Sequence, residues 1–327
     1  MSHPSFIQLY PTLRCNQGCS FCFNQNISGK AFRRDMTEKK AFHLIDTALE
    51  WNISEIDILG GEPLLIPWIF DFIQCASDRN ITINISTNGG LTGATARLSE
   101  ILPATVNVGV SILGFAETHN FLTRSDNFSK SVSGIKRMIA AGKPPIVKSV
   151  LIKGNEHEMS RLVSFFAEIG VQKYFLLHED IIGRPADTVC SSFPEFLASY
   201  TKLHKGFSGQ LDIGFVAASG FYKYGVGKQG RCDAGTTKLA IMPDGSVFPC
   251  NLLIGFREFL LGNVFQDDMK MIWNNPILQY FRNFNQKNPC NIINCSYHKT
   301  CTGGCPAHSY SFFHALDAID PRCRNKA

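Results

Sequence analysis

Three cysteines near the start of the chain have the spacing of a metal-binding loop. Cys15, Cys19 and Cys22 lie close together directly after an apolar stretch. Thiolates bind zinc and also iron-sulfur clusters. A structural zinc site needs four ligands, whereas an iron-sulfur cube held by three thiolates leaves one iron free to bind another molecule. The loop therefore predicts a cluster with an open iron.

The end of the chain carries a second, larger group of cysteines. Seven of the twelve cysteines lie from residue 232 onward, at positions Cys232, Cys250, Cys290, Cys295, Cys301, Cys305 and Cys323. The one clear element there is a hairpin, 238–242 and 246–250, turned by Asp244-Gly245. Because so little periodicity remains, we expect metal to hold this region together. Zinc is the alternative to clusters, with His298 or His308 as a further ligand.

Most of the chain repeats a strand followed by a helix, which is typical of parallel α/β folds. Thr37 is a candidate helix cap, and Gly142 and Gly170 occupy positions where helices end. The loops at the carboxyl ends of such strands converge on ligands. Six strands are predicted, over residues 6–12, 55–60, 82–87, 105–113, 146–153 and 173–179.

The first cysteine loop, CX3CX2C after the first strand, resembles that of the radical S-adenosylmethionine (radical SAM) superfamily. Other stretches agree: Gly60-Gly61-Glu62-Pro63 resembles the GGEP motif of that family, and Ser111-Ile-Leu-Gly is followed by His119 and Arg124. Leu113 stands where the family has aspartate. The resemblance implies an α/β fold, a partial (β/α)6 TIM-type barrel. It also implies a SAM-binding [4Fe-4S] cluster on Cys15, Cys19 and Cys22, with SAM contacts from Gly60, Gly61, Glu62, Ser86, Asn88, Ser111 and Arg124.

The tail is similar to the SPASM extension of radical SAM enzymes, in its cysteines, in the hairpin 243–250 and in the run 261–264. One departure is Cys290-X4-Cys295, where the family has two intervening residues. The resemblance implies two auxiliary [4Fe-4S] clusters, the first on Cys232, Cys250 and Cys305 and the second on Cys290, Cys295, Cys301 and Cys323. Residues 225–231 contain no cysteine, so the first auxiliary cluster keeps an open iron or takes a non-cysteine ligand.

Two cysteines and two charged stretches remain. Cys75 is predicted to be a small buried apolar residue in a helix. Cys190 follows the sixth strand, where a thiol could return a hydrogen atom to a substrate radical; an incidental loop cysteine is the alternative. Lys148 interrupts an apolar strand and residues 178–180 close the sixth, and charged groups at buried positions need a partner or a ligand. We regard both as candidates for substrate contacts.

Composition excludes several classes of protein. The formal net charge is +5, and 32 basic residues are scattered among 27 acidic ones, which predicts no nucleic-acid partner. No apolar run is long enough to span a membrane, and no secretory signal begins the chain, so we expect a cytoplasmic protein. We predict a barrel over residues 1–184, a linker or bridging region over 185–230, and the cluster domain over 231–327.

The family resemblance implies an oxidoreductase-type enzyme that reductively cleaves SAM to a 5′-deoxyadenosyl radical and abstracts a substrate hydrogen atom. The predicted substrate is a ribosomally made peptide that is crosslinked, epimerised or oxidised. One alternative is an epimerase, dehydrogenase or decarboxylase acting on a small molecule such as a sugar or antibiotic precursor; another is a non-catalytic iron-sulfur electron-transfer protein. Expected partners are a low-potential electron donor of the flavodoxin or ferredoxin type and a separate peptide-recognition protein. Asn251 replaces the aspartate base of anaerobic sulfatase maturases, which disfavours that activity.

Overall fold

The computed structural model describes residues 3–27, 34–101, 103–184, 190–218, 232–284, 301 and 303–323. Cys290 and Cys295 lie outside these residues. The strands are β1 (Phe6–Leu9), β2 (Glu55–Ile58), β3 (Thr82–Thr87), β4 (Val106–Ser111), β5 (Ile146–Leu151), β6 (Lys173–His178), β7 (Asp212–Val216), β8 (Lys238–Ile241), β9 (Ser246–Phe248) and β10 (Gly262–Asn263). The α-helices are α1 (Glu38–Glu50), α2 (Ile69–Ser77), α3 (Thr92–Ile101), α4 (Ala116–Thr123), α5 (Phe128–Ala140), α6 (Met159–Glu168), α7 (Phe193–Gly206), α8 (Met269–Trp273), α9 (Ile277–Phe284) and α10 (Pro306–Phe313).

Strands β1 to β6 confirm the predicted strand-helix repeat. Each pairs in parallel with the next, and in β3, β5 and β6 buried residues alternate with more accessible ones. Thr37 accepts a hydrogen bond from the Lys40 N–H and caps α1 as predicted. Gly142 and Gly170 have positive φ angles of 73° and 100°, which glycine adopts at low cost at a helix end.

The sheet is wider than the six predicted strands. The region expected to link two parts of the chain contains α7, which begins with a capping box formed by Ser192 and Glu195. It also contains β7, which pairs in parallel with β6. Gly214 interrupts the short apolar run of β7, and this weakened the strand signal in the sequence.

The tail continues the same sheet. Strand β8 pairs in parallel with β1 on the edge opposite β2, and β9 and β10 extend the sheet in antiparallel fashion. Tyr10 from the end of β1 packs with Phe248, Cys250, Phe259 and Phe281 in a second apolar cluster. The tail therefore does not lack a core, because it shares both a sheet and an apolar cluster with the barrel. That metal also holds this region stays a prediction.

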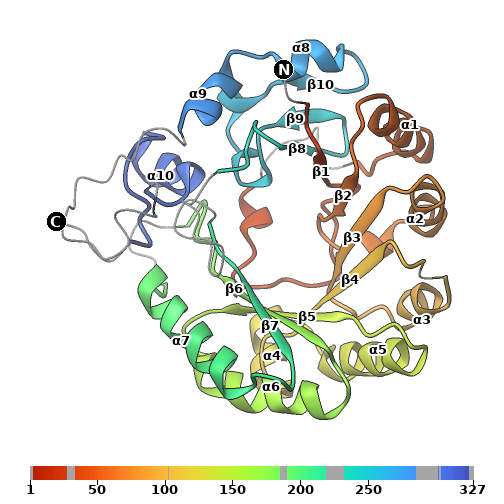
Figure 1. Cartoon of the computed structure of the whole chain (residues 1–327), viewed down its shortest axis with the longest axis vertical. Helices are drawn as coiled ribbons and strands as arrows, with labels where there is room; N and C mark the ends of the chain where they lie inside the picture. Colours follow the sequence, from red (N-terminus) through yellow and green to blue (C-terminus); the bar gives the residue numbers. More distant parts are fainter. Residues whose placement is uncertain are drawn as a thin grey trace.

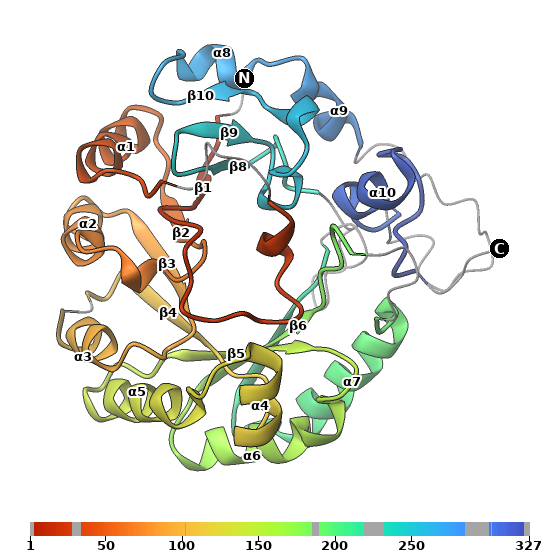
Figure 2. The ribbon, with the colours of Figure 1, turned by 180° about the vertical axis from the view of Figure 1, so that it is seen from behind.

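The strands are arranged around a ring, with α1, α2, α3, α5 and α7 on its outer side (Figures 1 and 2). The loop that follows β1 crosses the open centre of this ring at one end, as Figure 2 shows. Within the described part of the chain, no helix has the length and apolar character needed to cross a membrane.

Candidate functional site

The loop that carries Cys15, Cys19 and Cys22 is held at the mouth of the barrel by the end of α4. The Gly18 N–H donates to the Thr123 carbonyl at 3.0 Å, and the Ser20 N–H donates to the Leu122 carbonyl at 2.9 Å. Gly18 also faces Arg124, which caps α4 in the left-handed region at φ 50°. The structure thus brings Arg124, a predicted SAM contact, beside the first cysteine loop.

The two glycines after β2 hold the other side of this loop. A Cβ on Gly60 would overlap the Thr12 carbonyl, and one on Gly61 would overlap the Arg14 carbonyl. The Gly61 N–H donates to Thr12 at 2.9 Å, and the Glu62 N–H donates to Arg14 at 2.8 Å. The missing side chains therefore let one backbone approach another. SAM contacts by Gly60 and Gly61 stay predictions.

Glu62 is 1% exposed, and protein donors occupy its carboxylate. Its oxygens accept from the Leu64 N–H at 3.1 Å, the Thr87 hydroxyl at 2.8 Å and the Asn88 N–H at 2.8 Å. Burial raises the pKa of Glu62 to about 7, against the lowering effect of these three hydrogen bonds. The expected contact with the SAM ammonium stays a prediction, and the observed contacts give Glu62 the task of joining the ends of β2 and β3.

Asn88 links the end of β3 to the cysteine loop. Its side-chain amide donates to the Asn16 side chain at 2.7 Å and lies 3.9 Å from the Cys15 sulfur. Its side-chain oxygen accepts from the Gly90 N–H at 2.8 Å. Asn88, predicted to contact SAM, thus lies against Cys15, a predicted cluster ligand.

The remaining predicted contacts after β4 differ in exposure. Ser111 is partly buried at the carboxyl end of β4, and Arg124 is exposed. His119 is only 1% exposed. Its Nδ1 accepts from the Leu113 N–H at 3.1 Å, and its Nε2 lies 3.1 Å from Asn127 Oδ1. Burial lowers the pKa of His119 to about 4, so the ring is neutral and holds α4 in place.

The thiols of the first loop share one environment. Burial, together with the charges of Cys22 and Cys15, raises the pKa of Cys19 to about 12. Within the described residues, no group of three or more His, Cys, Asp or Glu side chains surrounds a single metal-ion position. A cube differs from a single ion because each thiolate binds a different iron, so the ligands stand further apart. Three neighbouring thiols on one loop fit such a cluster.

Cys232, Cys250 and Cys305 come from three distant segments and converge in the tail. Burial raises the pKa of Cys305 well above its usual value, and the charges of Cys250 and Cys232 act in the same direction. Lys238 is their neighbour: burial lowers its pKa, but the three thiolates raise it overall. These are the three residues predicted for the first auxiliary cluster, and their convergence fits one. Of the second predicted set, Cys301 and Cys323 are partly buried, and the other two lie outside the described residues.

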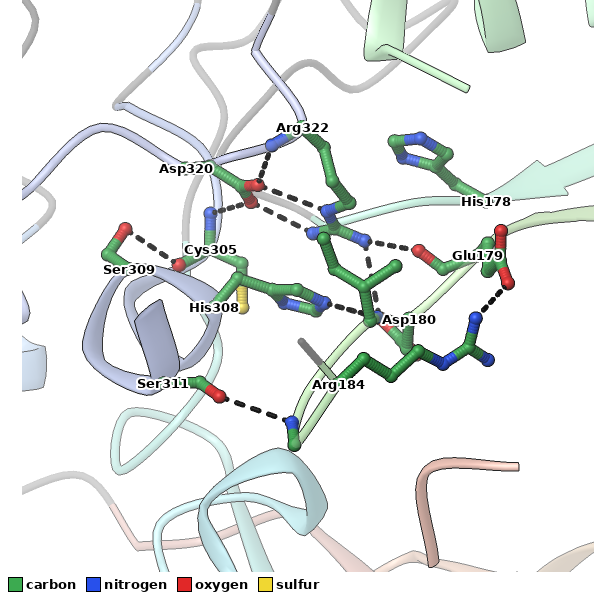
Figure 3. Close-up of polar contacts among 12 residues, drawn as sticks. His178, Glu179, Asp180, Arg184, Cys305, His308, Ser309, Ser311, Asp320 and Arg322 are labelled. Atoms are coloured by element: carbon green, nitrogen blue, oxygen red, sulfur yellow. Dashed lines mark hydrogen bonds and ion pairs between the residues drawn. The ribbon is translucent and has the colours of Figure 1, made fainter. Parts of the chain in front are cut away.

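A buried ion network joins this cysteine region to the end of β6 (Figure 3). Asp320 accepts from the Cys305 N–H at 2.8 Å and from the Arg322 guanidinium at 2.9 Å. Arg322 also donates to the Glu179 carbonyl at 3.0 Å and lies 3.3 Å from Asp180. Burial would raise the pKa of Asp320, but the Arg322 charge holds it at about 2. The network therefore fixes Cys305 relative to the barrel.

His308 belongs to the same network rather than to a zinc site. Its Nε2 accepts from the Ile181 N–H at 3.1 Å and lies 3.4 Å from Asp180 Oδ1. Burial and the nearby Arg322 lower its pKa well below the usual value. This neutral ring thus packs α10 onto the segment that follows β6.

Sequence reasoning missed Asp320, Arg322 and Tyr10. Tyr10 is buried between the two cysteine regions: burial raises its pKa, and the charges of Cys22 and Cys250 raise it further. One signal was available for the other two, since acidic and basic side chains flank Pro321 directly before Cys323. The partners of Arg322, which directly follow β6, could not be read from the chain.

The other residues that the sequence analysis singled out, Cys75, Cys190 and His178, have different neighbours. Cys75 is partly buried against the main apolar cluster and contacts Arg79. Cys190 is partly buried; burial raises its pKa, and the Arg322 charge lowers it. His178 stacks on Phe196 at 4.8 Å between ring centroids, so this residue faces α7 rather than a substrate.

Two family models match the chain. The model described as the radical SAM superfamily matches residues 9–166, and the SPASM model, an iron-sulfur cluster-binding domain, matches residues 232–302. The chain belongs to the radical SAM superfamily and carries a SPASM domain. This radical SAM enzyme thus belongs to a class that binds iron-sulfur clusters and SAM.

Similar proteins differ in what they act on. The mycofactocin maturase MftC of Mycobacterium ulcerans is 25% identical over 323 residues, covering 95% of this chain and 85% of that protein. An AdoMet-dependent heme synthase of Methanosarcina barkeri is 27% identical over 348 residues, covering 98% and 96%. Streptococcus suis SuiB, solved with its precursor peptide SuiA, superposes with a TM-score of 0.77 at 19% identity, covering 99% of this chain and 76% of SuiB. The SuiB likeness shows that the fold is shared.

Proposed function

We propose that this radical SAM/SPASM enzyme modifies a ribosomally made peptide by crosslinking, epimerisation or oxidation. The observation that carries the proposal is the placement of the cysteine loop across the barrel mouth, next to Asn88 and Arg124. The maturase activity of MftC, whose similarity covers nearly the whole chain, supports a maturation reaction. The precursor peptide bound by SuiB, which has the same fold, supports a peptide substrate.

Each residue of the mouth has a distinct task in this proposal. Cys15, Cys19 and Cys22 hold the first [4Fe-4S] cluster. When bound, this cluster and SAM supply a 5′-deoxyadenosyl radical that removes a hydrogen atom from the substrate. Asn88 positions the loop, and Arg124 offers an exposed guanidinium to the SAM carboxylate.

Two further [4Fe-4S] clusters complete the proposed cofactor set. Cys232, Cys250 and Cys305 hold one, and their observed convergence supports this assignment. Cys290, Cys295, Cys301 and Cys323 hold the other. The auxiliary clusters relay an electron to or from the substrate radical or help to position the substrate.

The proposed reaction needs other molecules. A low-potential donor of the flavodoxin or ferredoxin type supplies the electron, and a separate protein that recognises the precursor peptide delivers the substrate. We place the reaction in the cytoplasm, where thiols stay reduced; no disulfide links the ten cysteines of the described residues.

Cys190 is the proposed hydrogen donor if the reaction is an epimerisation. The thiol would return a hydrogen atom to the substrate radical, leaving a sulfur radical that the electron relay reduces. In deuterated water, inversion with deuterium gained at carbon is expected, and the Cys190→Ala variant should lose it. A two-electron oxidation would place no solvent deuterium at that carbon.

The test uses anaerobically reconstituted, reduced protein with SAM and the short peptides encoded beside its gene. Mass spectrometry should detect 5′-deoxyadenosine together with a peptide that has lost two hydrogen atoms or, for an epimerisation run in deuterated water, has gained one deuterium. The similarity to a heme synthase over 98% of the chain favours a small-molecule substrate as the second candidate. SAM cleavage that no peptide stimulates, but that a cell-extract metabolite fraction does, would favour this candidate.

A further inference from the structure

Polar side chains line the inside of the barrel between β2 and β5. On β5, the side chains of Val147, Ser149 and Leu151 are buried, whereas the alternate residue Lys148 is more accessible. Because neighbouring residues of a strand point to opposite faces of the sheet, Lys148 faces away from the outer helices and into the barrel. Its register partner on β4 is Ser111, the last residue of that strand. Lys148 thus lies level with the barrel mouth.

The lysine side chain reaches across an entire strand. Its Nζ donates to Ser86 Oγ on β3 at 3.0 Å, passing over Gly109 on β4. A Cβ on Gly109 would lie 2.5 Å from this Nζ and closer still to Cε. The absence of a side chain at Gly109 therefore creates the space in which the ammonium rests.

This ammonium has no ion-pair partner among the residues that the structure describes. Burial lowers the pKa of Lys148, and the charge of Asp57 raises it without coming within ion-pair distance. Removing a charge from water costs free energy unless a counter-charge and hydrogen bonds compensate. Among the described residues, therefore, no carboxylate pairs directly with this ammonium.

We propose that Lys148 and Ser86 form a subsite that binds a carboxylate inside the barrel mouth. The lysine retains further N–H donors, and the Ser86 hydroxyl, which accepts from lysine, has no recorded acceptor among the described residues. Both groups can donate to one carboxylate, which is a charge-assisted arrangement. The carboxylate is that of the substrate, because Arg124 is already assigned to the SAM carboxylate; this assignment rests on the proposed function.

The first experiment measures binding to the anaerobically reconstituted, oxidised holoprotein by calorimetry. The probes are SAM, decarboxylated SAM, and N-acetylglutamate in the presence of saturating SAM. Lys148→Met should weaken one carboxylate probe about tenfold, the loss expected for one charge-assisted hydrogen bond, and Lys148→Arg should retain most of the affinity. Lys153→Met, an exposed lysine just after the same strand, is the matched control and should bind like the wild type.

The choice of probe identifies the source of the carboxylate. A loss confined to N-acetylglutamate supports the substrate subsite; a loss confined to SAM, with decarboxylated SAM unaffected, would overturn it and assign the lysine to SAM. Equal affinities of wild type and Lys148→Met for both carboxylates would overturn the subsite. Because no turnover is measured, failure of SAM cleavage would refute the proposed function without altering this result.

A second measurement uses the wild type alone and does not depend on how the variants fold. Trace acetylation by acetic anhydride is followed by mass spectrometry at Lys148 and, as a reference, at Lys153. The carboxylate probe that binds should protect Lys148 and leave Lys153 unchanged, whereas decarboxylated SAM or N-acetylglutamine should not. Equal labelling of Lys148 with and without both carboxylates would also overturn the proposal.

Discussion

The two groups of cysteines are built in different ways. Cys15, Cys19 and Cys22 share one short loop, whereas Cys232, Cys250 and Cys305 come from segments far apart in the chain. Backbone contacts to α4 and to the residues after β2 hold the first group. A buried network of side chains, centred on Asp320 and Arg322, anchors Cys305 in the second. A local site can thus be recognised from spacing alone, but a distributed site depends on partners that only the fold brings together.

The largest expected effect comes from removing the first group of cysteines, the local site, and measuring what happens to the second group, the distributed site. The triple variant Cys15→Ala, Cys19→Ala, Cys22→Ala should abolish formation of 5′-deoxyadenosine. If the two regions hold their clusters independently, iron should fall from about 12 to about 8 atoms per chain, the content of two cubane clusters. Cys75→Ala should change neither measurement. Retained SAM cleavage in the triple variant would disprove the assignment of the first loop.

Asp320→Asn tests the distributed site. The change leaves the Arg322 guanidinium buried without its main counter-charge, and breaking such a pair costs about 3–5 kcal/mol. Urea unfolding should show this loss, and the iron bound with Cys305 should be released more rapidly. Asp317→Asn, an exposed neighbour, should unfold like the wild type.

The pH dependence of the Asp320→Asn effect has a defined sign. The folded pKa of about 2 lies below the unfolded value of 3.8, so the stabilisation is present above the unfolded value and is lost as pH falls toward the folded one. The difference between variant and wild type should therefore be constant from pH 5 to pH 8. A difference that varies across this range would contradict the ion-pair explanation.

A further test concerns His119, which holds α4 and so supports the first cysteine loop. Its folded pKa of about 4 lies below the unfolded value of 6.5, so the folded state binds fewer protons between these values. Lowering the pH from 7 to 5 should therefore reduce the free energy of unfolding of the wild type by about 2 kcal/mol more than that of His119→Gln. Urea midpoints at the two pH values measure this, with exposed His157→Gln as the control. Parallel pH profiles for wild type and His119→Gln would disprove the neutral buried ring.

The smallest expected effect concerns Asn88, the side chain from β3 that reaches the local loop. Asn88→Ala removes its hydrogen bond to Asn16, worth about 1 kcal/mol. The dissociation constant for SAM, measured by calorimetry, should rise about fivefold. Asn107→Ala, which removes a hydrogen bond elsewhere in the barrel, should leave it unchanged. No change in Asn88→Ala would show that the loop holds its position unaided.

Local patterns in the sequence predicted much of the fold. Thr37, Gly142 and the six strands were identified because helix caps and apolar periodicity depend on residues near each other in the chain. The hydrogen-bonding role of Glu62 was not predicted, because its donors lie at the end of β3 as well as on its own loop. The Lys148 to Ser86 contact depends on the register of three strands and on Gly109 between them. Such relationships exist only once the sheet has formed.

The pairing of β1 with β8 has a consequence for the order of events during synthesis. Phe6 lies opposite Lys238, so β1 can pair with β8 only after a much later part of the chain has been synthesised. Contacts between such distant residues form slowly because a long loop must close first. Until the tail has been made, the edge of β1 opposite β2 has no strand to pair with. Strand β1 is therefore among the last strands to gain both of its neighbours.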